Sequence, residues 1–205
     1  MGEYLAAVEA AREAHPEIEV LVGCEMDWLG DDEDRVITAG GVAPFQLILG
    51  SVHLVDRWPF DDPAQRGRWD EVGADLIWRR YFEVWCDAPF HVMSHPDLAK
   101  KFGFYPSFDP QPLYEQAAEA CAAAGRMVEV NTSGSYYACK EMFPAPALLA
   151  AFCRAGVPCT VGTDAHVPAN VARDIEKAYR LMYEAGYRTV TVPTADGDRR
   201  EVTIV

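Results

Sequence analysis

Two apolar stretches, IEVLVGCEMDW (18–28) and FQLILGSVHLV (45–55), indicate the fold of this 205-residue chain. Their runs LVGC and LILG are continuously apolar rather than alternating, which is typical of parallel strands covered by helices. The run TVG in PCTVGTDAH (158–166) has the same character, and further strands are expected at HVMSH (91–95) and RMVEVNTS (126–133). These stretches predict a parallel sheet of about five strands, close to the usual size of a sheet.

Helical patterns separate the predicted strands. Helices are expected at 3–15, 70–87, 111–124, 145–155 and 169–185. Gly125, Gly156 and Gly186 follow the last three, and glycine at that position commonly stops a helix. Two further β-like runs, 187–193 and 200–205, flank a turn signal. Alternating strands and helices predict the α/β class, either a barrel or an open sheet.

Length, charge and cysteine usage exclude several classes of protein. The length suits a single domain over 1–205. The net charge of −14 disfavours binding to nucleic acid or to an anionic membrane. No apolar run is long enough to span a membrane, and no signal-peptide pattern opens the chain, so we expect a cytoplasmic protein. The six cysteines form no CxxC pair and are expected to be reduced, and the acidic run 31–34 to be a solvated loop.

Potential metal ligands follow the apolar part of several predicted strands. They are Glu25 after LVGC, His53 after LILGSV, His95 after HVMS, and Asp164 and His166 after TVG. The carboxyl ends of parallel strands meet at one edge, so these side chains could converge around one point. Mixed carboxylate and imidazole donors suit zinc, manganese or iron better than calcium or magnesium. Such an ion polarises a phosphoryl oxygen and lowers the pKa of bound water towards about 7.

Each of these residues also has a structural explanation. A single histidine at a strand end is more often structural than a ligand, and Asp164 alone could cap a helix. Glu25 is the most informative, because a carboxylate after an apolar strand is costly unless it is paired or bound to a metal. The joint pattern therefore favours a shared metal site. His15, expected at the surface, and His91, at the start of a strand, are expected to lie outside it.

Further polar residues lie on the segments after these strands. Asn131 in EVNTSG could either bind substrate or shape a turn. Lys100, Lys101 and Arg57 lie on the loops 96–110 and 57–69, where they could bind phosphate or be solvated surface charges.

Five motifs occur in order along the chain, and together they resemble the PHP (polymerase and histidinol phosphatase) family, especially its histidinol-phosphatase branch. They are GCEMDW, GSVHLVDRWPFDDP, MSHPDLAKKFG, EVNTSG and GTDAH, and the likeness runs from about residue 3 to 168. The resemblance implies a distorted β/α barrel with a cluster of metals. It also implies ligand roles for the glutamate of GCEMDW, the histidines of GSVH and SHPD, and both acid and histidine of TDAH: Glu25, His53, His95, Asp164 and His166.

The sequence departs from the family pattern in two places. The HxH pair that begins family members is absent, so we expect an incomplete barrel with one firm metal at Glu25, His53 and His95, and a second weaker or absent. Similar proteins also carry a basic pair after EVNTSG, where this sequence reads SYYACK. Tyr136 therefore becomes a candidate substrate contact, and a less charged or bulkier ester is favoured over histidinol phosphate.

The sequence thus predicts a metal-dependent hydrolase of small phosphoric mono-, di- or triesters, with Asp164 or His166 as base or second ligand. The alternatives are a histidinol-phosphate phosphatase and an inactive PHP-fold fragment or binding protein. An open barrel exposes a sheet edge and core side chains, so a homodimer that covers them is also expected.

Overall fold

A computed structural model describes residues 1–30 and 44–204 of the chain. The predicted acidic loop at 31–34 lies outside these residues. Within them, every helix is too short or too polar to cross a lipid bilayer. All six cysteines carry free thiols, as the sequence predicts.

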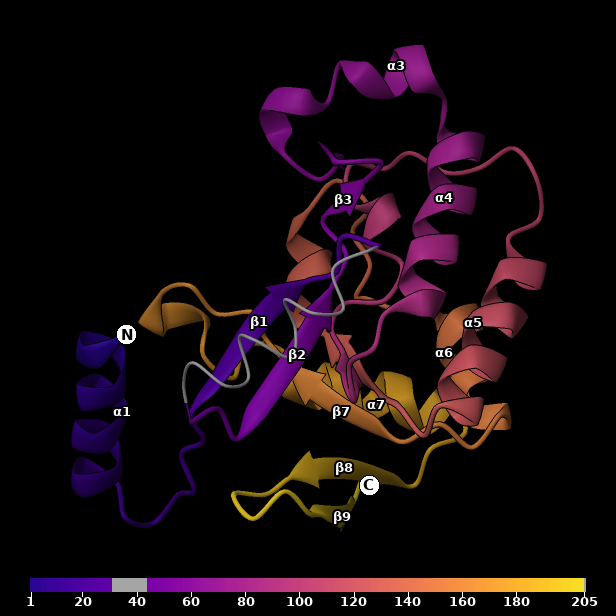
Figure 1. Cartoon of the computed structure of the whole chain (residues 1–205). Coiled ribbons are helices and arrows are strands. Elements are labelled where there is room, and N and C mark those ends of the chain that lie inside the picture. Colours follow the sequence, from indigo (N-terminus) through magenta and orange to yellow (C-terminus); the bar gives the residue numbers. More distant parts are fainter. Residues whose placement is uncertain (31–43, 205) are drawn as a thin grey trace.

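A five-stranded sheet forms the centre of the molecule (Figure 1). Its strands are β1 (Gly23–Asp27), β2 (Leu47–Ser51), β5 (Val92–Met93), β6 (Met127–Asn131) and β7 (Cys159–Gly162). All neighbours pair in parallel, and the spatial order β1-β2-β5-β6-β7 follows the chain. Among the described residues no pairing joins β7 to β1, so the sheet stays open. The predicted α/β class and incomplete barrel are confirmed.

Four helices cover one face of this sheet and contact one another in chain order (Figure 1). They are α4 (Ala74–Asp87), α5 (Gln111–Ala123), α6 (Pro146–Arg154) and α7 (Ile175–Ala185). Met93 and Val128 from the strands and Trp85 and Phe152 from the helices belong to the same buried cluster. Gly50 of β2 permits a close approach, because an added Cβ would lie 2.1 Å from the Phe90 ring.

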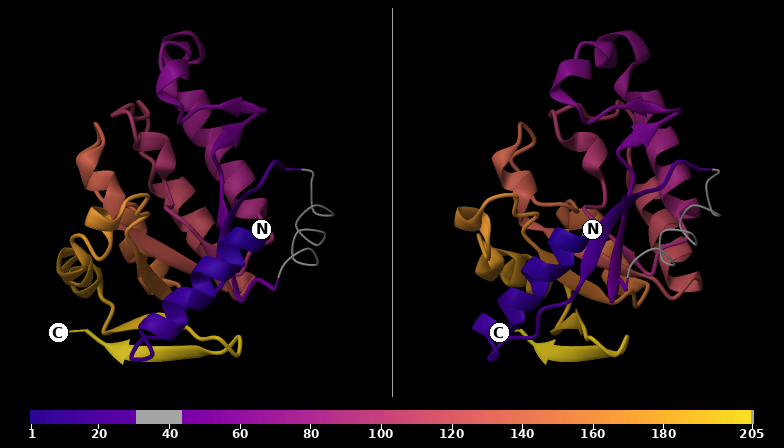
Figure 2. Two further views of the ribbon diagram at one scale, coloured as in Figure 1. Left: turned by 90° about the vertical axis from the view of Figure 1, so that its left-hand side faces the viewer. Right: turned by 60° about the vertical axis from the view of Figure 1, so that its left-hand side comes forward.

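The N-terminal helix α1 (Gly2–Ala14) lies on the side of the sheet away from α4–α7, in front of it in both views of Figure 2. None of its residues is buried. The Tyr4 hydroxyl donates to the Gly23 carbonyl (2.6 Å) and accepts from the Gly23 amide (3.1 Å). Side-chain hydrogen bonds therefore hold α1 beside β1.

The C-terminal residues form an antiparallel hairpin of β8 (Thr189–Pro193) and β9 (Arg199–Thr203), as predicted (Figure 1). The hairpin lies near the start of β1 and β2, where the Ala195 amide donates to Glu19 and the Ala195 carbonyl accepts from Gln46. A groove of about 590 Å³ lies between this hairpin, residues 17–21 and the face of the sheet opposite α4–α7.

The segments after the strands are more ordered than the sequence indicates. The predicted loop 57–69 contains β4 (Trp58–Pro59), paired with β3 (Leu54–Val55), then η1 (Pro63–Gln65) and the start of α3 (Arg68–Val72). The predicted helix 70–87 is broken at Gly73, whose φ of 86° is left-handed. Short 3₁₀ turns η2 (Leu98–Lys100), η3 (Thr132–Tyr136) and η4 (Pro168–Asn170) follow β5, β6 and β7.

Candidate metal centre

Three predicted ligands meet at the carboxyl edge of the sheet. Glu25 lies on β1, and His53 and His95 follow β2 and β5. Glu25 Oε1 lies 2.8 Å from His95 Nε2 and 3.6 Å from His53 Nε2. One donor atom of each residue lies within 4.8 Å of the other two. The parallel register places Glu25 of β1 beside Leu49 of β2, the strand that His53 follows, and so brings Glu25 and His53 towards the same end of the sheet.

Two neighbouring side chains fix the orientation of this cluster. Asp27 Oδ1 lies 2.5 Å from His53 Nδ1, so Nε2 is the ring nitrogen that faces Glu25. The Ser51 hydroxyl donates to Glu25 Oε1 at 2.5 Å. A carboxylate on the far nitrogen of a metal-binding histidine fixes its tautomer and raises its basicity. The spacing of two residues between Glu25 and Asp27 predicts that both face the same side of the strand, beside the other potential ligands.

The electrostatics favour an ionised Glu25 beside the two imidazoles. Burial raises the pKa of Glu25, but the hydrogen bond and charge of His95, the Ser51 hydroxyl and His53 lower it to about 2. Burial lowers the pKa of His53, and the hydrogen bond and charge of Asp27 more than reverse this, so the net shift is upward. Glu25 is therefore a carboxylate at neutral pH.

The donor set fits a divalent transition metal. Two imidazole nitrogens and one carboxylate oxygen form a ligand set found in catalytic zinc sites, where the remaining position holds water or substrate. His95 is 3% exposed, and its Nδ1 makes no hydrogen bond within the described residues. Glu25, His53 and His95 are therefore the residues that could hold the ion.

Asp164 and His166 do not belong to this group of donors. Asp164 follows β7 with a φ of 48°, and its side chain is 20% exposed. Its carboxylate lies 3.5 Å from the Ser133 hydroxyl and 3.4 Å from His166 Nδ1. The His166 side chain is 82% exposed. Their predicted roles as ligands and catalytic groups stay predictions.

A buried carboxyl group on β6 lies behind the cluster. Glu129 is 5% exposed, and its Oε2 accepts from the His95 amide and from Asn131 Nδ2, both at 3.0 Å. Burial raises the pKa of Glu129, and the donors around it oppose this. Asn131 also caps η3 by accepting from the Ser133 amide, so it shapes the turn, the structural one of its two predicted roles. Sequence reasoning missed Glu129, whose signal is an acid within the apolar strand MVEVN.

Two adjacent lysines have opposite environments. Lys100 is fully buried, and its ammonium contacts Asp97, Glu141 and the Met142 carbonyl. The prediction that Lys100 binds substrate is therefore wrong, because its charge is enclosed by partners inside the protein. Lys101 is 15% exposed and pairs with Asp61 at 2.8 Å.

Lys101 is linked to the candidate metal centre through a series of contacts. Its ammonium is 4.9 Å from the centre of the Tyr137 ring. The Tyr137 ring packs against Phe143 (6.4 Å), and Phe143 packs against His95 (6.3 Å). Asp61, its ionic partner, is one of the charges that raise the pKa of His53. Lys101 is thus joined to His95 and His53 through intermediate residues, and its predicted contact with substrate stays a prediction.

The other predicted substrate contacts lie on the surface. Tyr136 is 50% exposed, donates its hydroxyl to Asp174 at 2.6 Å and stacks against Arg173, whose Cζ is 3.5 Å from the ring centre. Arg57 lies in the turn between β3 and β4 with a φ of 63°. Tyr136 thus joins the segments after β6 and β7.

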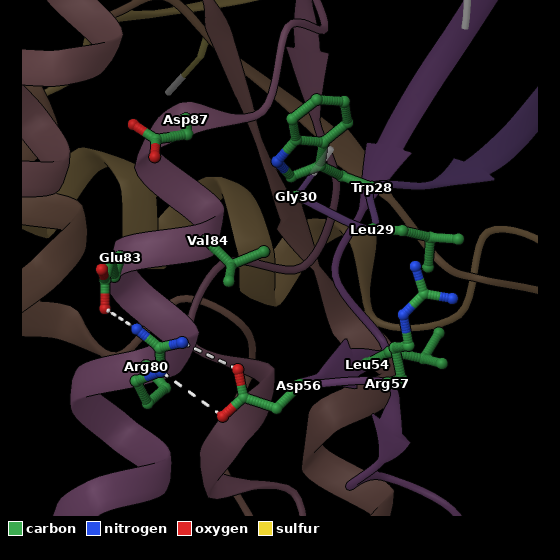
Figure 3. A pocket seen from close by; sticks show the side chains of 10 residues that line it. All are labelled: Trp28, Leu29, Gly30, Leu54, Asp56, Arg57, Arg80, Glu83, Val84 and Asp87. Carbon is green, nitrogen blue, oxygen red and sulfur yellow. Dashed lines mark hydrogen bonds and ion pairs between the residues drawn. The ribbon is translucent and has the colours of Figure 1, made fainter. Parts of the chain in front are cut away.

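Arg57 lines a pocket of about 340 Å³ between this turn and α4 (Figure 3). In it, Arg80 of α4 lies between Asp56 (2.8 Å) and Glu83 (2.6 Å). Trp28 and Leu54, which directly follow Asp27 and His53, form part of its wall. The turn after His53 is thereby tied to a helix.

Comparison with known proteins agrees with the fold and the cluster. The PHP domain family model matches residues 1–133. The chain belongs to the PHP domain family. A probable histidinol-phosphatase of Deinococcus radiodurans is 31% identical over 197 residues, which cover 93% of this chain and 75% of that protein.

A solved structure shows the same PHP fold. The histidinol phosphate phosphatase of Lactococcus lactis subsp. lactis, in complex with zinc, L-histidinol and phosphate, aligns with a TM-score of 0.80 at 21% identity. The alignment covers 95% of this chain and 77% of that one. The predicted family is confirmed, and so is the predicted enzyme class, a metal-dependent phosphatase, at the level of the family.

Proposed function

We propose that this PHP domain hydrolyses phosphoric esters with a water molecule activated by one divalent transition metal held by Glu25, His53 and His95. The observation that carries the proposal is the convergence of these three donors within 4.8 Å at the carboxyl edge of the sheet. A bound ion of this kind supplies a nucleophilic hydroxide near neutral pH and polarises a phosphoryl oxygen.

Other residues of the protein would orient the ligands, bind the anionic ester and accept a proton. Asp27 keeps His53 Nε2 facing the cluster, and Lys101 offers the cationic side chain that an anionic ester needs in a chain of net charge −14. Asp164 and His166 would accept a proton from water or hold a weaker second ion. Both follow β7, at the same edge of the sheet as the three donors.

Histidinol phosphate is the first specific substrate to test. The relative that is 31% identical over 93% of this chain is a probable histidinol-phosphatase, which supports this choice. Tyr136 and Tyr137 occupy the segment after EVNTSG and favour a less charged or bulkier ester. A panel of histidinol phosphate, aryl monoesters, diesters and triesters, compared by kcat/KM, separates these substrates.

Metal content tests the proposal directly. Elemental analysis of the purified protein, and of protein reconstituted with zinc, manganese or iron, should give about one ion per chain, as expected for a single catalytic site. His53→Ala should lose the ion and the phosphatase activity. His15→Ala is the matched control, since this side chain is 60% exposed and contacts Glu17 outside the site.

Two results would decide against the proposal. A protein that takes up no metal on reconstitution, and turns over no ester, would instead support a binding protein that kept the fold without catalysis. Activity that survives His53→Ala would place the reaction elsewhere. The expected homodimer and cytoplasmic location stay predictions, and light scattering tests the first of them.

A further inference from the structure

The side chain of Glu129 contacts the backbone of a candidate ligand, His95, and not the imidazole of that residue. It points from β6 towards β5 and accepts the His95 amide at 3.0 Å. β5 ends at Met93, and the Ser94 amide makes the last bond of this strand to β2, at the Gly50 carbonyl. The His95 amide is therefore beyond the sheet ladder and needs another acceptor, because an unpaired buried amide is costly.

The backbone of His95 needs this support. Its φ of 20° lies in a sparsely populated region for a residue with a side chain. Such conformations persist when the surrounding structure fixes them. The imidazole has contacts of its own, from Nε2 to Glu25 at 2.8 Å and to Ser94 at 3.3 Å, while its Nδ1 has no partner among the described residues. The direction of the ring depends on the peptide that carries it as well as on these contacts.

Gly162 of β7 provides the space that Glu129 occupies. It lies opposite Asn131 in the β6–β7 register, and an added Cβ would be 1.8 Å from Glu129 Oε1 and 2.8 Å from Cδ. Any larger residue at this position would push the Glu129 carboxyl group from its place. Gly162 on β7 thus leaves room for the carboxyl group of Glu129 on β6, which in turn accepts the backbone amide of His95 after β5.

We propose that Glu129 is a positioning residue, which, with the space left by Gly162, holds the His95 backbone so that the imidazole meets Glu25 and His53. The proposal rests on the metal site of the proposed function. The role needs an oxygen acceptor at this point and needs neither a negative charge nor direct contact with the metal.

Three variants and one control test this role by zinc affinity, measured by chelator competition on the metal-free proteins. Glu129→Leu removes the acceptor, and Gly162→Ala displaces it, so each should weaken zinc binding by about 10–100-fold, as loss of a group that orients a ligand does. Glu129→Gln keeps the acceptor and should bind zinc nearly as tightly as the wild type. Gly67→Ala is the matched glycine control, because its φ is −61° and an added Cβ meets no atom within 4 Å.

The visible spectrum of the cobalt-substituted proteins provides a second readout. It should change in Glu129→Leu and Gly162→Ala and match the wild type in Glu129→Gln. Wild-type affinity in Glu129→Leu would overturn the positioning role and leave the proposed function intact. Equal weakening in Glu129→Gln and Glu129→Leu would show that the charge matters and would also overturn it. A wild type that binds none of zinc, manganese and iron would reject the proposed function itself.

Discussion

The β1–β2–β5 edge and the segment after β7 both carry carboxylate and imidazole side chains, but these side chains differ in their contacts and exposure. At the edge, Glu25, His53 and His95 contact one another, and Ser51 and Asp27 support two of them. After β7, the Asp164 carboxylate lies 3.5 Å from the Ser133 hydroxyl and 3.4 Å from His166 Nδ1, and the His166 side chain is 82% exposed. Position at a strand end brings a residue to the site, and partners in the neighbouring strands decide whether its side chain is held there.

The largest expected effect is on metal binding itself. Glu25→Gln should lose the bound ion and reduce kcat/KM by more than about 100-fold, the upper range for groups that only orient ligands. His166→Ala should keep the ion of the Glu25 cluster, whatever its effect on turnover. Metal analysis and kinetics on both variants measure this difference. Loss of the first ion in His166→Ala would show that the segment after β7 belongs to the same centre.

Substitutions of Lys100 and Lys101 should have different effects, the first mainly on stability and the second mainly on activity. Lys100→Met leaves the buried Asp97 carboxyl without its cation and should reduce the free energy of unfolding by about 3–5 kcal/mol. Lys101→Met should cost less stability, because its pair with Asp61 is less completely buried than the pair of Lys100 with Asp97, and should raise KM for anionic esters. Urea denaturation and steady-state kinetics test both. The reverse pattern would place the functional cation at Lys100.

The support of His53 by Asp27 should have a moderate effect. Asp27→Asn replaces a charged acceptor at Nδ1 by an amide and should weaken zinc binding by about tenfold. Ser133→Ala is the comparison from the β6–β7 side, where the hydroxyl contacts Asp164 at 3.5 Å. Titration of the metal-free proteins with zinc measures both. A larger loss of zinc affinity in Ser133→Ala than in Asp27→Asn would mean that the β6–β7 side contributes more to metal binding than the β1–β2–β5 edge.

Acid should weaken the metal-free protein through Glu25. Its pKa is lowered from 4.5 to about 2 in the folded protein, so its contribution to stability is present above about pH 4.5 and is lost as the pH falls towards 2. Glu25→Gln should therefore show a smaller loss of stability over this window. Thermal unfolding of both proteins in chelator, at steps between pH 5 and 2, measures the difference. Parallel curves would mean that the cluster does not hold Glu25 ionised.

The sequence predicts the parts of this arrangement that depend on local pattern. Gly125, Gly156 and Gly186 end their helices with positive φ, as predicted, and His53 follows the end of β2, whereas Glu25 lies in the middle of β1. The enclosure of Lys100 is invisible in the sequence, because Glu141 reaches it from a segment forty positions away.

The supporting residues need the register of the sheet as well as its strands. Glu129 matters because β6 places it beside the His95 amide, with its carboxyl group in the space that Gly162 leaves. No pattern within MVEVN reveals which neighbour an acid will meet. The predicted loop 57–69 is more ordered for a similar reason, since its structure forms around buried aromatic contacts of Trp58 and Phe60 with Trp69.

The smallest expected effect concerns the turn after His53. Arg80 joins this turn to α4 through Asp56, but the three charged side chains of the network are 39%, 62% and 59% exposed (Figure 3). Exposed ion pairs contribute little to stability because water screens them, so Arg80→Met should leave both the free energy of unfolding and the zinc affinity nearly unchanged. Urea denaturation and zinc titration measure both quantities. A clear loss of zinc affinity would mean that an exposed pair can hold a ligand in place, and the contrast between the strand edge and the exposed segments would no longer explain the site.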